Sequence, residues 1–291
     1  MSLESDLSHT GVQSVRECVV CGQSRTVRDD RWAELLALPS RYGVQRCAQC
    51  GLRWLSPRPD EPGLEIIYSG EHYFHSGGVT DYGQYADQRR ARFAERAALL
   101  GEMGARTVLD YGAATGEFVA AARQAGLDST GVEFSAAARE DAARKGIDLL
   151  PPDAPLGTFD AIHMNHVLEH MPDPVAHLRW CHDHLNAGGV LAIEVPQQFD
   201  NAADQLRRLT GKGGRQAEFD AFSVHHTYFF TPATLREACT LAGFHVETLR
   251  TAITPNPNIG SAKRRLLESL LAWSAAHRMT GDVIELYARK I

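Results

Sequence analysis

The stretch RTVLDYGAATGEFVAAARQAG, residues 106–126, constrains the fold more than any other part of the chain. A short apolar run predicts a β-strand, a turn containing glycine follows it, and the remainder has the pattern of a helix. A strand that leads through such a turn into a helix N-terminus forms the cradle of a nucleotide-binding α/β unit. We therefore expect an α/β fold.

The next segment contains an acidic residue at the sequence spacing typical of a ribose-binding acid. STGVEFS predicts a second strand ending at Glu133, which follows Asp110 by 23 residues. At that spacing, an acid at the end of the second strand can bind ribose hydroxyls. The turn also departs from the dinucleotide fingerprint G-x-G-x-x-G, because Ala114 stands at its middle position. The pattern favours a nucleotide-sized cofactor without a pyrophosphate.

Residues 105–291 resemble the class I S-adenosylmethionine-dependent methyltransferases, through VLDYGAATG and the fourth-strand motif FDAIHMNHVLEHMPDP. The resemblance implies a Rossmann-like sheet of seven strands, mostly parallel with an antiparallel last strand. It also implies S-adenosyl-L-methionine as cofactor, with Asp110 near its amino-acid end, Glu133 on its ribose and Phe134 on its adenine. The expected cofactor-binding residues are Asp110, Gly112, Ala113, Gly116, Glu133, Phe134, Asn165 and His166.

HVLEH, residues 166–170, also matches the H-x-x-E-H string of inverted zinc peptidases. That function needs His166 and His170 one turn apart on a regular helix. The apolar run at 159–164 instead predicts a strand that ends just before Asn165. Ligands of open α/β sheets bind at the carboxyl ends of strands, so we expect these residues at the cofactor site rather than in a peptidase.

Four cysteines near the start of the chain form two C-x-x-C-G knuckles, made by Cys18, Cys21, Cys47 and Cys50. Four thiolates are a ligand set for zinc, and the glycine after each pair permits the tight turn that aims both sulfurs at one ion. A disulfide or redox function is disfavoured, because thioredoxin-like motifs occur singly. We expect a small zinc ribbon whose Zn²⁺ is structural.

The knuckles and the following SPRPDEPGLEIIY resemble the zinc-binding leader of natural-product sugar methyltransferases. The C-methylating members of that group carry a Tyr-His-Glu-His cluster with a base that removes a carbon-bound proton. The matching segment here is FDAFSVHHTYFFT, in which Ser223, Val224 and His225 replace the first three and only His226 matches. We therefore expect methylation of a hydroxyl or amine of a small metabolite in natural-product biosynthesis, over C-methylation of a nucleotide-linked sugar.

A histidine suffices to deprotonate a hydroxyl near neutral pH, whereas a neutral amine needs only positioning. His226 is the first candidate base, and His225 and His170 are the next. The alternative interpretation is that these histidines fix a loop by hydrogen bonds.

The pattern along the chain predicts three parts: a zinc ribbon at 1–70, a helical linker or lid at 71–104, and a methyltransferase domain at 105–291 with an insertion at about 252–280. No apolar run approaches the ~20 residues of a membrane span, and the start lacks the profile of a signal peptide. We expect a cytoplasmic protein that acts on a small-molecule acceptor. The sequence makes no prediction of the oligomeric state.

Two other functions remain open. An RNA base methyltransferase could use the basic runs RRLTGKGGR and SAKRR, although a net charge of −6 and a pI near 6.1 argue against nucleic-acid binding. A zinc-ribbon interaction protein without catalysis would have no need of Asp110, Gly112, Gly116 and Glu133 together.

Overall fold

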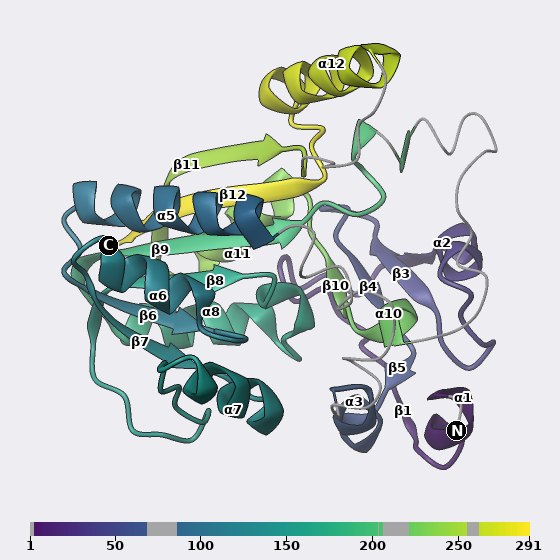
Figure 1. Cartoon of the computed structure of the whole chain (residues 1–291). Coiled ribbons are helices and arrows are strands. Elements are labelled where there is room, and N and C mark those ends of the chain that lie inside the picture. The colour runs from purple at the N-terminus through teal and green to yellow at the C-terminus, as the bar shows by residue number, and fades with distance from the viewer. Residues whose placement is uncertain (1–2, 69–85, 203, 206–220, 255–261) are drawn as a thin grey trace.

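The central sheet has the expected mixed α/β architecture (Figure 1). The computed structural model describes residues 3–68, 86–202, 204–205, 221–254 and 262–291. Within them, six strands pair in the order β11-β12-β9-β8-β6-β7. Their bounds are β6 Thr107–Tyr111, β7 Asp128–Val132, β8 Phe159–Asn165, β9 Leu185–Pro196, β11 Phe244–Ala252 and β12 Val283–Lys290.

Only β12 runs against the others, antiparallel to both β9 and β11, as expected for the last strand. The sheet differs from the expectation in having six strands instead of seven. Where the third strand would stand, the described chain makes one isolated parallel bridge, Val132 to Leu150. A strand needs several consecutive paired residues, and a single bridge does not provide them.

Alternating residues of the strands face two separate helical layers. Val108 and Ala161 belong to a cluster that includes Phe93 of α5. Leu109 and Ile162, one residue further along, belong to another that includes residues of α8 and α11. In Figure 1, α5 and α6 accordingly lie in front of the sheet. The helices here are α5 Ala86–Glu102, α6 Glu117–Gln124, α7 Ala136–Arg144, α8 Pro174–Asp183, α11 Pro232–Leu241 and α12 Ala262–Arg278.

The N-terminal part forms two small antiparallel sheets and three short helices. One sheet pairs β1 (Val12–Gln13) with β5 (Arg58–Pro59). The other has the order β10-β4-β3-β2, with β2 Thr26–Arg28, β3 Val44–Cys47 and β4 Arg53–Leu55. The helices are α1 Leu3–Leu7, α2 Asp30–Leu35 and α3 Glu61–Tyr68.

The fourth strand of that small sheet comes from far along the chain. β10, Tyr228–Phe229, follows the short helix α10, Ala221–Val224, and pairs antiparallel with β4 through Tyr228–Trp54 and Phe229–Arg53. Trp54 and Tyr228 are both buried in one cluster with residues of α8 and α11. The ribbon therefore packs as a continuation of the core.

Two expected regions lie partly outside the described residues. Of the linker at 71–104, the structure describes α5, and the rest of the expected lid falls within 69–85. Of the insertion at about 252–280, it describes α12, which contacts β11. Among the residues described, no helix combines the length and apolar character that crossing a membrane requires.

The start of α11 is held by a local capping arrangement that can be tested. Thr231 accepts a hydrogen bond from the Thr234 amide, and Thr234 Oγ1 accepts one from the Thr231 amide at 2.9 Å. Replacing a capping threonine by alanine typically lowers the free energy of unfolding by ~1 kcal/mol. We expect this loss for Thr231→Ala in urea denaturation, and a smaller one for the exposed control Thr240→Ala.

Candidate active site

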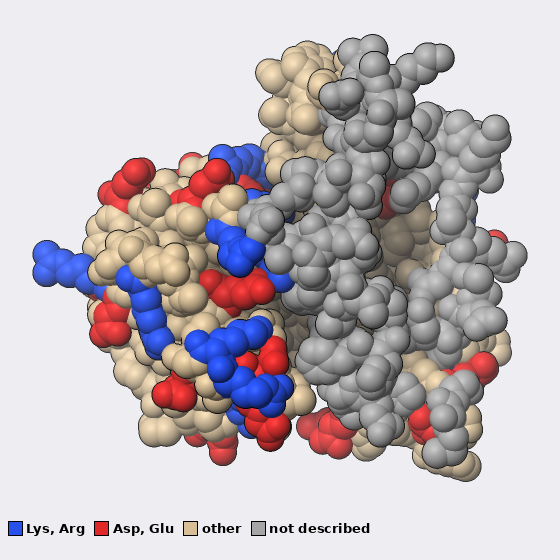
Figure 2. Space-filling view, in the orientation of Figure 1, with Lys and Arg blue, Asp and Glu red and all other residues tan. Residues whose placement is uncertain are grey.

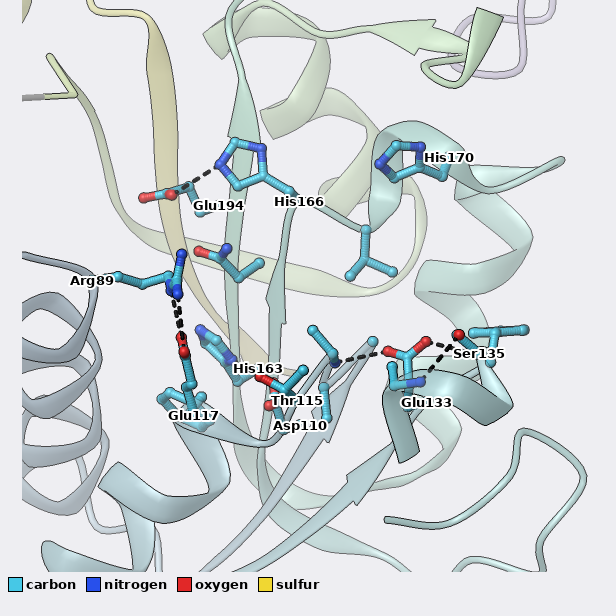
Figure 3. A pocket seen from close by; sticks show the side chains of 18 of the residues that line it. Arg89, Asp110, Thr115, Glu117, Glu133, Ser135, His163, His166, His170 and Glu194 are labelled. Atoms are coloured by element: carbon cyan, nitrogen blue, oxygen red, sulfur yellow. Dashed lines mark hydrogen bonds and ion pairs between the residues drawn. The ribbon is translucent and has the colours of Figure 1, made fainter. Parts of the chain in front are cut away.

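A cavity of about 1110 Å³ opens where β6, β7 and β8 end (Figure 3). This is the edge at which open α/β sheets bind ligands. Gly116 is not among its lining residues and immediately precedes α6. The other expected cofactor-binding residues line the cavity together: Asp110, Gly112, Ala113, Glu133, Phe134, Asn165 and His166.

The turn after β6 depends on its glycines. Gly112 and Gly116 have φ values of +79° and +80°, a region that side chains with a Cβ rarely adopt. A Cβ on Gly112 would also lie 2.5 Å from Val167 Cγ2, and one on Gly116 would lie 2.7 Å from Ile147 Cγ2. The side chains of Val167 and Ile147 thus approach the backbone of Gly112 and Gly116 more closely than a residue with a Cβ would allow.

Glu133 is oriented by the turn that it faces. Its carboxylate accepts hydrogen bonds from the Ala114 amide at 2.7 Å and from the Ser135 amide at 2.8 Å. Burial raises the pKa of Glu133, although these amides oppose the shift. Phe134 beside it is 52% exposed. An oriented carboxylate beside an accessible aromatic ring at the cavity wall suits a ribose and an adenine.

Asp110 is engaged by a residue that sequence reasoning missed. His163 Nδ1 lies 2.7 Å from Asp110 Oδ1, and both side chains are buried. Desolvation lowers the pKa of His163 despite the carboxylate, so the neutral ring donates its Nδ1 proton to Asp110. The signal was a histidine inside the apolar run FDAIHM, since a buried polar side chain needs a partner.

A buried group of charges closes another side of the cavity. Arg92 and Arg96 of α5 both pair with Glu194 of β9, and each lies 3.3 Å from Glu285 of β12. Arg96 also donates to Asn165 Oδ1 at 2.6 Å. Sequence reasoning missed this group, although Glu194 inside the apolar run GVLAIEVP was again a polar residue in a buried strand.

The segment after β8 is not a regular helix, which removes the peptidase interpretation. His166 has a φ of +54° just past the strand end, and Leu168–His170 form a single 3₁₀ turn. His166 Nε2 lies 3.2 Å from Glu194 Oε1 and Nδ1 lies 3.4 Å from Glu169 Oε1. In Figure 3 the rings of His166 and His170 both project at the end of the pocket away from Glu133.

The three candidate histidines gather around this segment. The ring centroid of His170 lies 5.4 Å from that of His225 and 4.8 Å from that of His226. Of the three, His170 is the one that lines the cavity. Burial and the neighbouring histidines hold the pKa of His226 well below 6.5. Glu169, which sequence reasoning considered only as the acid of the H-x-x-E-H string, is fully buried beside them.

The four N-terminal cysteines come together as expected. Cys18 Sγ lies 3.5 Å from Cys50 Sγ, Cys21 Sγ lies 3.4 Å from Cys47 Sγ, and all four atoms lie within 4.8 Å of one another. Four sulfurs each ~2.3 Å from one zinc ion would be spaced similarly, so the cluster is consistent with a zinc site. Gly22 and Gly51, with φ values of +70° and +82°, form the knuckle turns as predicted.

Curated relatives match part of the chain. A trans-aconitate 2-methyltransferase of Deinococcus radiodurans is 31% identical over 136 residues, which are 44% of this chain and 53% of that protein. A ubiquinone biosynthesis O-methyltransferase of Xanthomonas axonopodis pv. citri is 34% identical over 98 residues, 31% of this chain and 37% of that protein. The chain thus spans about half or less of the length of these relatives.

The fold is shared with solved methyltransferase structures. A chain of the complex between the Haloferax volcanii Trm112 methyltransferase activator and a methyltransferase has a TM-score of 0.54 at 20% identity, covering 75% of this chain and 96% of that one. The family model described as "Methyltransferase domain" matches residues 81–249, more than half of the sequence. Because this model covers more than half of the sequence, the chain belongs to this methyltransferase family.

Proposed function

We propose that this chain is an S-adenosylmethionine-dependent methyltransferase that methylates an oxygen atom, or a nitrogen atom, of a small metabolite, in a natural-product pathway. The observation that carries the proposal is the polar end of the cavity, where His166 and His170 lie across from Glu133 (Figure 3). When bound, S-adenosylmethionine supplies an electrophilic methyl group. The histidine end of the cavity then receives the acceptor.

The names of the relatives favour oxygen. One acts on trans-aconitate, a small carboxylic acid, and the other is an O-methyltransferase. Methylation of carbon is less well supported, because only His226 remains of the four residues that resemblance associates with a carbon-bound proton. The acceptor's identity is therefore proposed only as a small molecule with a nucleophilic oxygen or nitrogen.

The cluster of His170, His225 and His226 would activate a hydroxyl acceptor. His170 reaches the cavity directly, and its Nδ1 is fixed 2.8 Å from the His225 carbonyl oxygen. His226 lies behind it, with its Nδ1 2.7 Å from Gln198 Oε1. These contacts orient both rings, which supports a shared role in removing the acceptor's proton.

Charge distribution disfavours an RNA acceptor. Among the described residues on the face shown in Figure 2, Lys and Arg side chains stand beside Asp and Glu rather than in a continuous basic patch. Binding of nucleic acid relies on neutralising phosphates, which interspersed acids oppose. The run RRLTGKGGR falls outside the described residues. The intact cofactor cradle likewise disfavours a non-catalytic interaction protein.

Glu133→Gln should weaken cofactor binding, because it removes the charge from a hydrogen bond to ribose. Hydrogen bonds to charged groups contribute about 1.5–3 kcal/mol, which corresponds to a roughly 10- to 100-fold rise in Kd. Calorimetric titration with S-adenosylhomocysteine measures it. Glu140→Gln, exposed on α7, is the control. An unchanged Kd in Glu133→Gln would remove the ribose role.

His226→Ala should lower turnover by about 10²–10⁴, the range associated with losing proton transfer to or from the reacting group. S-adenosylhomocysteine affinity should stay within about 2-fold, because His226 does not line the cavity. The exposed His245→Ala is the matched control and should keep full turnover. Full turnover in His226→Ala would exclude His226 from acceptor activation.

We also propose that the four-cysteine cluster holds structural Zn²⁺. Cys50→Ser should then bind one zinc ion fewer than the unaltered chain and unfold at a lower temperature, since structural zinc contributes folding energy. Mass spectrometry for metals and thermal unfolding check both. Cys239→Ala, buried outside the cluster, should keep the full zinc content. Equal zinc content in Cys50→Ser would reject the site.

A further inference from the structure

Glu169 is a buried acid without the hydrogen bonds that such a group normally needs. Its side chain is fully buried, and neither carboxylate oxygen has a hydrogen-bond partner among the described residues. The ring of His166 lies nearby, with Nδ1 3.4 Å from Glu169 Oε1, but its Nε2 also pairs with Glu194, so the two acids share one imidazole. Buried charges in proteins are paired or coordinate metals. Glu169 Oε1 lies 3.8 Å from both His170 Nε2 and His226 Nε2, too far for hydrogen bonds.

The two histidines are set up to present lone pairs toward this oxygen. His170 Nδ1 faces the carbonyl oxygen of His225, and His226 Nδ1 faces the amide oxygen of Gln198. A carbonyl oxygen only accepts, so each Nδ1 carries the proton and each neutral ring keeps its lone pair on Nε2. Metal-binding histidines typically show this arrangement, in which one nitrogen donates to a carbonyl and the other coordinates.

The spacing fits one ion. Oε1 of Glu169 and the two Nε2 atoms lie within 4.8 Å of one another. Ligands ~2.0–2.2 Å from a tetrahedral zinc ion are about 3.3–3.6 Å apart, so only small shifts would bring these three atoms to bonding distance. Three acceptor atoms at this spacing are a ligand set that a cation at their centre would stabilise.

We infer that Glu169, His170 and His226 bind a divalent transition-metal ion of the zinc class, at a site distinct from the four-cysteine cluster. Two histidines, one carboxylate and an open fourth position are a ligand set of catalytic zinc. Because His170 lines the cavity, the open position faces the acceptor end.

The ion would deepen the proposed function and rests on it for its role, though not for its binding. An acceptor hydroxyl coordinated at the open position becomes more acidic, because the cation stabilises the alkoxide. Its oxygen–hydrogen bond would break and the proton would pass to solvent water. The oxygen's electron pair would then form the bond to the methyl carbon, while the methyl–sulfur bond breaks and its electrons stay on the sulfur of the departing S-adenosylhomocysteine. His226 would then activate the acceptor through the ion.

The site can be tested by measuring how much metal the protein binds, a measurement that needs neither methyl donor nor acceptor. The intact chain, equilibrated with excess Zn²⁺ and then gel-filtered, should carry two equivalents, whereas Glu169→Gln and His226→Ala should carry one. The exposed control His245→Ala should carry two. Repeating the titration with Co²⁺ separates the sites, because only the cysteine site gives thiolate charge-transfer absorption, which also reports that each variant is folded.

One equivalent in the intact chain, lost in Cys50→Ser, would overturn the inference, as would two equivalents retained in both Glu169→Gln and His226→Ala. Loss of the thiolate absorption in His226→Ala would mean that this variant is misfolded. The metal content of Glu169→Gln then decides between the two outcomes, because glutamine keeps the shape of the glutamate side chain. Failure here would leave the methyl-transfer proposal standing, because that proposal is tested separately by turnover.

Discussion

Thr227 joins the ribbon to the active site through its backbone. Its amide donates to the Glu169 carbonyl at 2.9 Å, its hydroxyl donates to the same oxygen at 3.0 Å, and its own carbonyl accepts from the Leu55 amide at 2.9 Å. The residue is fully buried, so each bond is shielded from water and costly to lose. Thr227 therefore connects two parts of the molecule through its own hydrogen bonds: the 3₁₀ turn that carries Glu169 and His170, and the edge of β4.

Buried charge performs a similar task on the other side of the cavity. Arg96 links α5 to Glu194 of β9 and to Asn165 at the end of β8. Removing one partner from such a group would leave an unpaired charge, which is far more costly than the pair is stabilising. The cavity is thus bounded by a hydrogen-bonded turn on one side and an ionic contact on the other, and both restrict how β8 can end.

Local signals predicted much of this molecule. The strand, turn and helix around Gly112, the acid at Glu133 and the gathering of four cysteines followed from patterns within a few residues, whereas the antiparallel last strand was implied by the family resemblance. The expectation of a seventh strand, third in the chain, was wrong. Beside Val132 the described chain forms a single isolated bridge, through Leu150, and no strand. The pairing of β10 with β4 could not be predicted, since it joins residues more than 170 positions apart and each strand is very short. His163 and Glu194 were missed for a related reason: a polar residue in an apolar run indicates that a partner exists, but the sequence does not show which residue that partner is.

The shared sheet β10-β4-β3-β2 has a consequence for recombination between homologues. A ribbon of this kind cannot be exchanged as a cassette at the boundary near residue 70, because its last strand is encoded more than 150 residues later. A chimaera that takes the N-terminal segment from one parent and the rest from another would pair a β4 and a β10 from different parents. Productive crossovers would have to transfer 3–68 together with 221–231, so His225 and His226 would be inherited with the ribbon.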